Sequence, residues 1–369
     1  MIQFKLKELR KRQRLTQQEL GDILHVSYQT ISKWENQVVL PDISVLPQIS
    51  SYFGVSVDAL LGLVPLEQKY SPSGSETEAY WDKKQEDLNV PAESIWNEDY
   101  IGFLIREVWK VRTPVSVLDC GCGTGRLGFL LMPLLPEGSR YVGVDFSRKM
   151  IDAAEETNRN LDTKAEFVLA DIRSWRPKEK YDMVISQAIL RHVNDGEELL
   201  RKMTDFLKKD GILVSMECNR EFEAGGLYIR GIDYGTLCRH QRLETLWRTE
   251  LEMENRDYSI AMKIPYYMKN AGLKNVACRM NDKVTFLEPE QPEYAGMLKK
   301  MVRAEHWDVE KTEDETEKII SSFMNHGMSR KEAEDYCRQQ EKITAYLKKR
   351  RGDVAVTKAA GYMISYGWK

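Results

Sequence analysis

The feature that most constrains the fold of this chain is an alternation of apolar runs and helical stretches that begins near residue 115. Strands of a parallel sheet that is covered on both faces read as continuous apolar runs, with helical segments between them. Five such runs occupy residues 115–118, 141–144, 166–169, 183–186 and 212–216. The alternation predicts an α/β domain built on a mostly parallel sheet.

The C-terminal part of the chain adds further strands and a charged helical block. Two further strands are expected at 275–280 and 361–367, which brings the sheet to seven strands, and 283–287 is a possible extra strand. Within the block, Thr312 with Glu315 and Ser329 with Glu332 have the spacing of capping boxes, which start helices. The alternating charge of the block suits a lid over a substrate, a solvated face or a dimer contact.

The first 64 residues show no strand pattern and are expected to form five short helices. These helices are expected at 4–12, from 17 to about 24, at 28–36, at 43–53 and at 56–61. Thr16 and Glu19 have capping-box spacing before the second helix, and Ser27 caps the third. Gly54 and Gly62 follow the last two helices, where glycine can take the positive φ of a helix end. Helices of this length bury one small core.

These helices carry the run LTQQELGDILHVSYQTISKWENQVVL, which resembles the Cro/repressor (XRE-type) helix-turn-helix family over residues 5–62. The resemblance implies a DNA-binding domain whose second crossed helix enters the major groove. It implies that Gln17 holds a phosphate. It also implies that bases and backbone are faced by Ser27, Tyr28, Gln29, Ser32 and Lys33. One departure is Gln37, which stands where the family often has a helix-ending glycine.

Charge supports DNA binding only through a local patch. The chain has 54 basic and 57 acidic residues and a formal charge of −3, so it is not a polycation that coats nucleic acid. Residues 1–64 carry seven bases against six acids, and six of these bases lie in the first fourteen residues. One such domain binds weakly, so a homodimer that reads two half-sites of an operator is expected. The alternative is a helical docking module without a DNA role, which leaves the surface at 27–36 unexplained.

The strongest signal for chemistry is the run VLDCGCGTG at residues 117–125. A buried strand there ends in an acid, and three glycines at alternate positions lead into a helix, so that a ligand can touch main-chain amides. Asp145 follows the next strand, where it can accept two ribose hydroxyls. Asp171 follows the third strand, where it can accept from an adenine amino group. Acids at the ends of three successive strands predict a purine-nucleoside site at the carboxyl edge of the sheet.

This series of motifs resembles the class I S-adenosylmethionine-dependent methyltransferases over residues 76–369, a family with a Rossmann-like, mostly parallel seven-stranded sheet. Further matches are YDMVISQ at 181–187 and LKKDGILV at 207–214, which correspond to the fourth and fifth strands. The resemblance implies S-adenosylmethionine as cofactor, with the aromatic-rich segment at 80–109 as its helical cover. It assigns cofactor binding to Asp119, Gly121, Gly123, Gly125, Asp145, Phe146, Asp171, Ile172 and Gln187.

A nicotinamide dinucleotide is the rival cofactor. Residues 123–128 read GTGRLG, which has the G-x-G-x-x-G form, and Asp145 lies twenty residues past Gly125. That fingerprint should begin directly after the strand, whereas residues 119–122 intervene here. A nicotinamide site also has no use for Asp171, so the sulfonium cofactor is favoured.

The six cysteines suggest neither a disulfide framework nor a metal site. Cys120 and Cys122 are two thiols without a nearby second pair, and a structural zinc ion requires four ligands. They are expected to pack in the tight turn, and no bound metal is expected. An arsenite-type thiol constellation with Cys218, Cys238 or Cys278 stays open.

The acceptor half of the site is less defined, because methyl transfer mainly needs the nucleophile and the methyl group to be aligned. His192 and Glu217 are the candidate catalytic residues, the first as a general base and the second as an anchor for an amine. Each has a plain alternative, a packed or capping histidine and a glutamate that bonds a loop. Other candidates near the acceptor are Arg191, Asn219, Arg220, Tyr228, Tyr234, Arg239 and His240.

DNA methylation is a natural alternative for a chain with a DNA-binding domain. Amino-directed DNA methyltransferases carry an Asn/Asp/Ser-Pro-Pro-aromatic element after the fourth strand, where this chain has SQAI at 186–189. The Pro-Cys pair of cytosine-C5 enzymes is absent from the sequence. The latter half of the chain has no obvious basic channel for a flipped base, so a small-molecule acceptor is favoured.

The sequence as a whole predicts a cytoplasmic protein with two domains. Its 369 residues are 42% hydrophobic and 30% charged, with neither a signal peptide nor an apolar run long enough to cross a membrane. A helix-turn-helix domain at 1–64 and a linker at 65–75 precede a methyltransferase domain at 76–369. That domain is expected to comprise a helical cover at 76–112, a core at 113–288, a lid or interface at 289–352 and a final strand at 353–369.

Three functions fit these features. The favoured function is a sequence-specific DNA-binding domain joined to an active small-molecule methyltransferase. The second is a transcriptional regulator whose methyltransferase-like half only senses S-adenosylmethionine or a metabolite. The third is a nucleic-acid methyltransferase. Asp145 and Asp171 favour the first function, although a sensor would also retain them.

Overall fold

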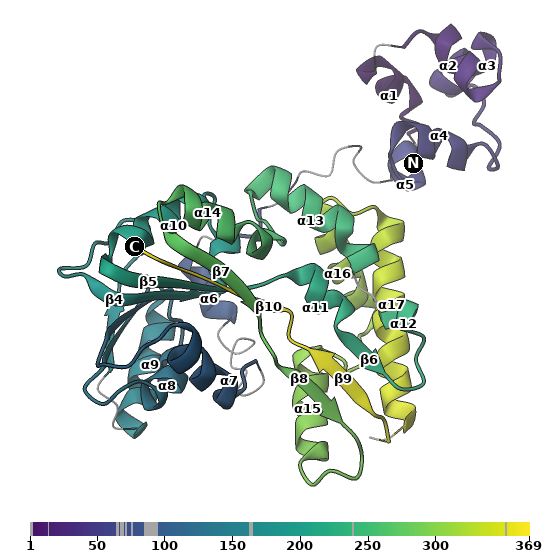
Figure 1. Ribbon diagram of the computed structural model, residues 1–369. Coiled ribbons are helices and arrows are strands. Elements are labelled where there is room, and N and C mark those ends of the chain that lie inside the picture. Colours follow the sequence, from purple (N-terminus) through teal and green to yellow (C-terminus); the bar gives the residue numbers. More distant parts are fainter. Residues whose placement is uncertain are drawn as a thin grey trace. The chain divides into compact units, whose positions relative to one another are not determined.

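The computed structural model describes residues 3–13, 15–63, 66, 70, 72–74, 77–84, 95–161, 165–237, 240–350 and 353–369, with the backbone alone at 12 and 240–242 (Figure 1). The chain divides into two compact units. One unit comprises Met1–Ser71 and Thr312–Cys337, and the other comprises Pro72–Lys311 and Arg338–Lys369. The helical block expected at 289–352 is therefore shared between the units. Within the described ranges, no helix is long and apolar enough to cross a membrane.

Five short helices form the N-terminal part of the first unit, as predicted. They are α1 (Leu6–Arg12), α2 (Gln17–Leu24), α3 (Tyr28–Glu35), α4 (Leu46–Phe53) and α5 (Val57–Leu60). Each contributes a fully buried side chain to one core, namely Leu6, Leu20, Ile31, Ile49 and Leu60. Helices this short are unstable alone, so these tertiary contacts hold them.

The helix ends predicted for this part are present. Thr16 Oγ1 accepts from the Glu19 amide at 3.1 Å, and Glu19 Oε2 accepts from the Thr16 amide at 2.7 Å, which completes the capping box. Ser27 caps α3. Gly54 and Gly62 have φ of 65° and 71°. The local sequence signals therefore determine where these helices begin and end.

The fourth helix begins later than the sequence suggests. It was expected from residue 43, whereas α4 begins at Leu46. Asp42 Oδ1 accepts from both the amide and the hydroxyl of Ser44, at 2.9 and 2.6 Å. This side-chain turn competes with a first helical turn and delays the helix.

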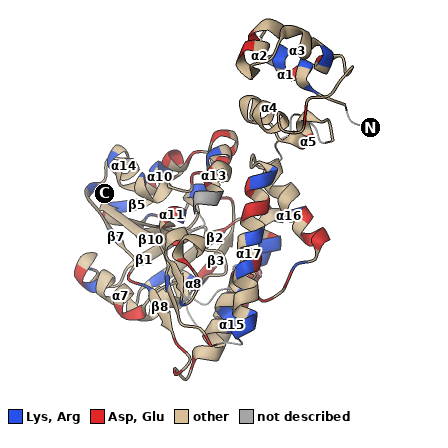
Figure 2. Ribbon diagram, turned by 90° about the vertical axis from the view of Figure 1, so that its right-hand side faces the viewer, with Lys and Arg blue, Asp and Glu red and all other residues tan. Residues whose placement is uncertain are grey.

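The first unit also contains α16 (Glu313–Asn325) and the start of α17 (Arg330–Arg350). Both helices begin with the predicted capping boxes, at Thr312 with Glu315 and at Ser329 with Glu332. A small apolar cluster joins them, made by Ile320, Met324, Ala333 and Cys337. Basic and acidic side chains alternate along α17, as Figure 2 shows.

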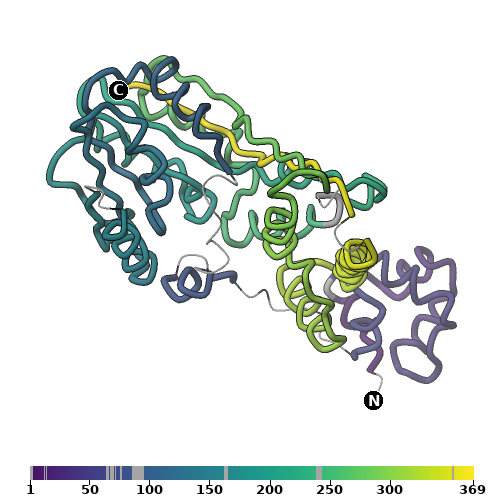
Figure 3. The backbone as a smooth tube through the Cα atoms, turned by 90° about the horizontal axis from the view of Figure 1, so that it is seen from below, coloured from purple at the N-terminus to yellow at the C-terminus, as the bar shows by residue number. Residues whose placement is uncertain are grey.

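The second unit is built on a seven-stranded sheet, as predicted. Its strands are β1 (Ser116–Cys120), β2 (Arg140–Asp145), β3 (Ala165–Leu169), β4 (Tyr181–Gln187), β5 (Leu207–Cys218), β7 (Lys274–Met280) and β10 (Tyr362–Trp368). The order is β3-β2-β1-β4-β5-β10-β7. The first five strands are parallel, whereas β10, the yellow C-terminal strand in Figure 3, is antiparallel to β5 and β7. The carboxyl ends of β1 to β5 therefore meet at one edge.

Helices cover both faces of this sheet, which explains its continuous apolar strands. They are α7 (Glu98–Phe103) with a π-helical turn (Leu104–Val108), α8 (Arg126–Leu131), α9 (Arg148–Leu161), α10 (Gly196–Asp205) and α14 (Ile264–Asn270). α7 and α8 pack with Val117 and Ile185 on one face. α10 and α14 pack with Leu118 and Val184 on the other. Neighbouring residues of β1 and of β4 thus enter two separate apolar layers. Figure 1 shows helices on both sides of the sheet.

A second, three-stranded sheet was not expected. Its strands, in spatial order, are β6 (Leu227–Ile229), β9 (Val356–Ala359) and β8 (Val284–Leu287), all antiparallel. The optional strand at 283–287 belongs to this sheet. α15 (Tyr294–Ala304) and α17 pack with it around the buried Trp307. β6 and β9 have only three and four residues, too few for a visible apolar alternation. The remaining α-helices in the described part of this unit are α6 (Glu78–Lys84), α11 (Arg220–Gly225), α12 (Tyr234–Leu237) and α13 (His240–Glu254).

Candidate functional site

A loop with three glycines follows β1 and leads into α8. Gly121, Gly123 and Gly125 have φ of 72°, 53° and 77°, in the left-handed region that favours glycine. A Cβ on Gly121 would lie 2.5 Å from Cγ2 of Ile189, in the segment after β4. A Cβ on Gly123 would meet no atom of the described residues within 4 Å. The loop is therefore tightly packed at Gly121 and open beside Gly123, where a ligand can approach the main chain.

Asp145 ends β2 and is tied to the glycine loop. Its Oδ2 accepts from the Gly123 amide and its Oδ1 accepts from the Ser147 amide, both at 2.9 Å. Burial raises the pKa of this carboxyl above its ordinary value. Each oxygen keeps a further lone pair, so a pair of hydroxyl groups can still donate to the carboxylate. Phe146, the next residue, is half-buried.

Asp171 lies two residues past the end of β3. Its carboxylate accepts from Nε and Nη2 of Arg173, at 3.0 and 2.9 Å, and from the Arg173 amide at 2.8 Å. Burial alone would raise the pKa of Asp171, but the hydrogen bonds from Arg173 outweigh it and the pKa lies below its ordinary value. The side chain is 36% exposed, so a ligand amino group has access to it. Ile172 packs against the apolar layer of the sheet.

Asp119 is the acid of β1, and it is buried beneath the loop rather than exposed at the sheet edge. Its residue exposure is 1%. The Tyr141 hydroxyl donates to Oδ2 at 2.6 Å, whereas Oδ1 has no partner among the described residues. Burial raises the pKa of Asp119 to about 7. The unpaired oxygen can accept from a ligand cation, and without one its ionisation costs stability.

The helix α6 lies across the carboxyl ends of β2 and β4. Asp82 Oδ1 accepts from the Ser147 hydroxyl at 2.9 Å, two residues past Asp145. Glu78 Oε1 accepts from the first amide of α9 at 3.0 Å. The Trp81 ring contacts the His192 ring edge to face, with centroids 4.7 Å apart. The segment ahead of the sheet therefore spans the edge at which the candidate ligand residues gather.

Gln187 is the last residue of β4, and a buried tryptophan contacts it. Trp96 Nε1 donates to Gln187 Oε1 at 3.2 Å. The Trp96 ring also packs on Tyr362, with centroids 5.5 Å apart. Trp81 and Trp96 both contact this edge of the sheet. Both belong to the aromatic-rich segment at 80–109 that is expected from the sequence to form a helical cover. Residues 85–94 of that cover lie outside the described ranges.

Glu217, a candidate catalytic residue, holds the segment that follows β4. Its Oε1 accepts from the amides of Ile189 and Leu190, both at 2.8 Å. Its Oε2 is buried and has no partner in the described part of the chain. Burial raises the pKa of Glu217 to about 7. Ala188, with φ of 57°, takes a left-handed conformation in the same segment. The contacts of Glu217 thus match the loop-bonding role.

His192, the other candidate, is a buried neutral imidazole. Arg191 Nε donates to its Nε2 at 2.9 Å, so the ring proton is assigned to Nδ1. That Nδ1 is buried without a partner among the described residues. Burial, followed by the charges of Arg191, Arg256 and Arg220, holds the pKa of His192 well below its ordinary value. The nitrogen that remains for a ligand is therefore a donor.

Ion pairs that no sequence pattern indicates surround His192. Arg256, two residues past the end of α13, pairs with Glu250 at 3.3 Å and lies over the ring of Tyr258, 5.3 Å from its centroid. The Tyr258 hydroxyl donates to Glu250 Oε2 at 2.6 Å. No motif or period marks the end of α13, which reads in sequence only as a charged helix end. Arg220, which was a candidate, pairs with Glu223.

Other acceptor candidates lie in different surroundings. Tyr228 and Tyr234 are 46% and 49% exposed, and the Tyr234 hydroxyl donates to a backbone carbonyl at 2.5 Å. Asn219 caps α11 by accepting from two of its amides. Arg239 and the side chain of His240 lie outside the described residues. These tyrosines and Asn219 are thus engaged in surface and capping contacts.

The two cysteines of the glycine loop are buried. Burial raises the pKa of Cys120 and of Cys122 well above the ordinary value. Cys218 is also buried, Cys278 is exposed, and Cys238 lies outside the described ranges. Among the residues that the structure describes, no group of three His, Cys, Asp or Glu side chains is placed to hold a metal ion.

The helix α3 turns its polar face outward. Ile31 and Trp34 are buried in the core of the first unit, which orients the opposite face towards solvent. Ser32 is half-buried on this face, and the exposed residues are Ser27, Tyr28, Gln29 and Lys33. Gln37 has φ of 56°, so it takes the left-handed conformation at the place where the resemblance expects glycine.

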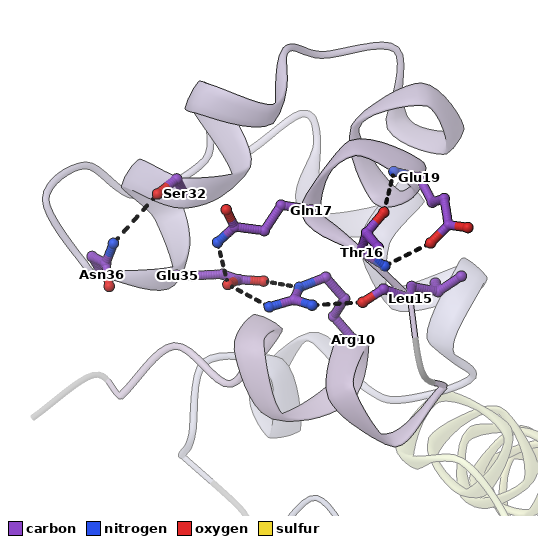
Figure 4. A network of polar contacts seen from close by, with 8 residues as sticks. All are labelled: Arg10, Leu15, Thr16, Gln17, Glu19, Ser32, Glu35 and Asn36. Atoms are coloured by element: carbon purple, nitrogen blue, oxygen red, sulfur yellow. Dashed lines mark hydrogen bonds and ion pairs between the residues drawn. The ribbon is translucent and has the colours of Figure 1, made fainter.

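A polar network joins α1, α2 and α3 (Figure 4). Glu35, whose side chain is fully buried, accepts from Arg10 Nε at 2.5 Å and from Arg10 Nη2 at 3.0 Å. Gln17 Nε2 donates to Glu35 Oε2 at 2.8 Å. Burial would raise the pKa of Glu35, but Arg10 and Gln17 lower it overall. The network fixes the Gln17 amide and leaves one of its N–H groups to donate outward.

Comparison with protein families finds two matches in this chain. Residues 6–60 match the family model described as helix-turn-helix. Residues 113–283 match the family model described as methyltransferase domain. The first range covers α1 to α5, and the second covers every strand of the main sheet except β10.

Individual relatives match parts of the chain. Ubiquinone biosynthesis O-methyltransferase of Pelagibacter ubique is 30% identical over 132 residues, which is 36% of this chain and 54% of that protein. Malonyl-(acyl-carrier protein) O-methyltransferase of Bacillus cereus is 33% identical over 111 residues, which is 30% of this chain and 40% of that protein. The chain thus spans about half the length of the curated relatives it matches. Among solved structures, phosphoethanolamine N-methyltransferase 2 of Haemonchus contortus has a TM-score of 0.44 at 14% identity, covering 79% of this chain and 57% of that one.

Proposed function

We propose that this chain, which joins a helix-turn-helix domain to a methyltransferase domain, methylates a small-molecule acceptor with S-adenosylmethionine and binds operator DNA. The observation that carries the cofactor part is the hydrogen bond from the Gly123 amide to Asp145, beside open space at the glycine loop. It supports a site in which a buried carboxylate and the loop backbone serve the same ligand. S-adenosylmethionine supplies a methyl group that is activated by the positive sulfur.

Each acid in the site has a distinct proposed role. Asp145 would bind the ribose hydroxyls through its remaining lone pairs. Asp171 would accept from the adenine amino group, with Ile172 beside the ring. Asp119, which lies beneath the loop, would accept a hydrogen bond from the ligand through Oδ1, the oxygen that has no hydrogen-bond partner among the described residues. Gly123 leaves room for the ligand, because no atom of the described residues lies within 4 Å of the place where its Cβ would be.

The catalytic work of the protein in this proposal is alignment rather than base catalysis. Positioning of a nucleophile against its target can lower a barrier by on the order of 7–11 kcal/mol. His192 presents a donor nitrogen, and Glu217 holds the segment after β4 through Ile189 and Leu190. Both residues therefore serve as positioning groups in the proposal, and neither acts as the general base.

The rival nicotinamide cofactor has less support. β1 ends at Cys120, so the first glycine of the G-x-G-x-x-G run, Gly123, stands three residues past the strand. The fingerprint requires its first glycine directly after the strand. This displacement of the glycine run favours the sulfonium ligand.

The proposed DNA-binding role rests on the outward face of α3. Gln29 can pair bidentately with adenine, and Lys33 can reach guanine or phosphate. Gln17, fixed by Glu35, would donate its remaining N–H to a phosphate. Because residues 1–64 carry only one net positive charge, we propose that a homodimer reads two half-sites.

A second candidate function is that of a sensor, in which cofactor or metabolite binding changes operator affinity without turnover. The joining of both domains in one chain favours this reading. The experiment is incubation of the full chain with methyl-labelled S-adenosylmethionine and a metabolite extract. Label in small molecules supports the methyltransferase. Label in added DNA or RNA supports a nucleic-acid methyltransferase. Cofactor binding without transfer, together with cofactor-dependent operator affinity, supports the sensor.

A further inference from the structure

Three buried hydrogen-bond donors that no described residue satisfies lie close to the proposed cofactor site. They are Arg191 Nη1, His192 Nδ1 and Arg256 Nε, and none has a partner among the described residues. Arg191 and His192 are each 9% exposed, in the short turn after β4, and the Arg256 side chain is 12% exposed, past α13. Here these three residues are called the donor cluster. A buried donor without a partner is rare in a native structure and asks for an explanation.

The charges around the donor cluster are not balanced. Arg256 is paired with Glu250, and Arg220 is paired with Glu223. Arg191 has no carboxylate at ion-pair distance within the described ranges, and the hydrogen bond from its Nε ends on the neutral His192. The nearest acid on β5, Glu217, uses one oxygen for two backbone amides, and its burial favours the protonated form. Glu223 also interacts electrostatically with Arg191, but it already pairs with Arg220. Three arginines therefore face two ionised acids, Glu223 and Glu250, and the cluster presents donors with an excess of positive charge.

The donor cluster shares its cover with the proposed cofactor site. Trp81 of α6 packs on the His192 ring, and Asp82 of the same helix bonds Ser147, two residues past Asp145. One turn of helix thus spans both places. A molecule held at the donor cluster would lie under the same cover as the cofactor, which is the position an acceptor needs.

We propose that the acceptor substrate carries an anionic group, a carboxylate or a phosphate, that Arg191, His192 and Arg256 bind. This inference rests on the proposed methyltransferase function. The oxygens of such a group would accept from the three unpaired nitrogens and compensate the charge of Arg191. Glu217, in its protonated form, would add a fourth donor through Oε2. The reacting nucleophile would lie elsewhere on the same molecule.

The first test asks which molecules receive the methyl group. A metabolite extract is separated by anion exchange into anionic, neutral and cationic pools, and each pool is incubated with the full chain and methyl-labelled S-adenosylmethionine. Label in the anionic pool supports the inference. Phosphatase treatment that shifts the labelled product identifies a phosphate, and an unchanged product identifies a carboxylate. Label only in the neutral or cationic pool overturns the inference and leaves the proposed function intact, whereas absence of both cofactor binding and transfer overturns the proposed function.

The second test uses simple anions and does not depend on turnover. The full chain, saturated with S-adenosylhomocysteine, is melted in benzoate, in inorganic phosphate and in chloride at matched ionic strength. We expect a higher melting temperature in benzoate or phosphate than in chloride, and loss of that difference in Arg191→Met. Equal melting temperatures of the wild type in all three salts would overturn the inference.

The third test separates the acceptor from the cofactor, whose own carboxylate is the competing anion. Arg191→Met is expected to keep the affinity for S-adenosylhomocysteine and to lower kcat/KM for the anionic pool by about 30-fold or more, mainly through KM. Arg191→Lys should restore part of the loss. Arg201→Met, at a position with a 63% exposed side chain on α10, is the matched control and should change neither value. If Arg191→Met weakens S-adenosylhomocysteine but not methylthioadenosine, which lacks the amino-acid part, Arg191 holds the cofactor and the inference is wrong.

Discussion

The amide of Gly123 donates a 2.9 Å hydrogen bond to Oδ2 of Asp145, which joins the glycine loop to the end of β2. The bond orients a buried carboxylate whose burial raises its pKa. Gly123 makes it with a φ of 53°, and no atom of the described residues occupies the space beside its α-carbon. The same contact therefore shapes the loop, positions the acid and leaves room for a ligand.

Replacement of Asp145 should remove cofactor binding. Asp145→Ala loses two hydrogen bonds to a charged group, each worth about 1.5–3 kcal/mol, so the Kd for S-adenosylhomocysteine should rise by roughly 100-fold or more. Isothermal titration calorimetry on the full chain measures this change. Asp152→Ala, with a 60% exposed side chain on α9, is the control and should bind as the wild type does. Unchanged binding by Asp145→Ala would contradict the proposed ribose contact.

Asp119 should make the stability of the chain depend on pH. Its pKa is raised to about 7 by burial, so the folded chain keeps this proton while the unfolded chain has released it above about pH 4. Stability from this group is therefore lost as pH rises from about 4 towards 7. The lowered pKa of His192 has the opposite effect on stability, because it removes stability as the pH falls below the ordinary pKa of histidine. The pH dependence must therefore be compared between the wild type and a variant that keeps His192.

The measurement is urea unfolding of wild type and Asp119→Asn at pH 5 and pH 8. From pH 5 to pH 8, the free energy of unfolding of Asp119→Asn should increase relative to that of the wild type, by about 2–3 kcal/mol at most. Asn keeps an acceptor for the Tyr141 hydroxyl, so the fold has no other reason to change. A difference between the two chains that is the same at both pH values would refute the assignment.

Gln37 should limit the stability of the helix-turn-helix domain. It holds a φ of 56°, and left-handed backbone costs a residue with a side chain about 1 kcal/mol relative to glycine. Gln37→Gly should therefore slow hydrogen exchange in peptides from α2 and α3 of the full chain. Gln37→Ala retains the Cβ and should give no such protection. If both variants behave alike, the backbone of Gln37 is not the cause.

Gln29 and Lys33 should affect DNA binding in different ways. After an operator has been selected from random sequences with the wild-type chain, Gln29→Ala should weaken binding by about 1–3 kcal/mol and relax specificity at one base. Lys33→Ala, if Lys33 contacts phosphate, should weaken binding to all DNA sequences alike. It should also lower the slope of log affinity against log salt concentration by about one. Gln48→Ala, exposed on α4, is the control. Operator binding that survives both α3 variants would place the DNA contact elsewhere.

The main sheet and most helix ends could be predicted from the sequence, because both depend on local signals. The apolar runs mark β1 to β5, and the capping boxes at Thr16 and Thr312 form as predicted. The start predicted for α4, at residue 43, was wrong. The Asp42 side chain accepts a hydrogen bond from the Ser44 amide, and this turn takes the place of a first helical turn. The short strands β6 and β9 were missed because their partners are distant in the chain.

The candidate site could be predicted only where it follows a motif. Asp145 ends β2 and Asp171 follows β3, as their strands require. The contacts of Glu217 with Ile189, and those of His192 with Arg191, depend on side-chain packing that no spacing encodes. Arg256 reaches the same region from beyond the end of α13, where it pairs with Glu250. In the sequence, both residues look like charges on a solvent-exposed helix end, so neither could be identified in advance.

The most direct measurement is calorimetric titration of the full chain with S-adenosylhomocysteine and, separately, with NAD. We expect saturable binding of S-adenosylhomocysteine, one molecule per chain, that Asp145→Ala abolishes, and no binding of NAD. Saturable binding of NAD with no response to S-adenosylhomocysteine would refute the proposed cofactor site.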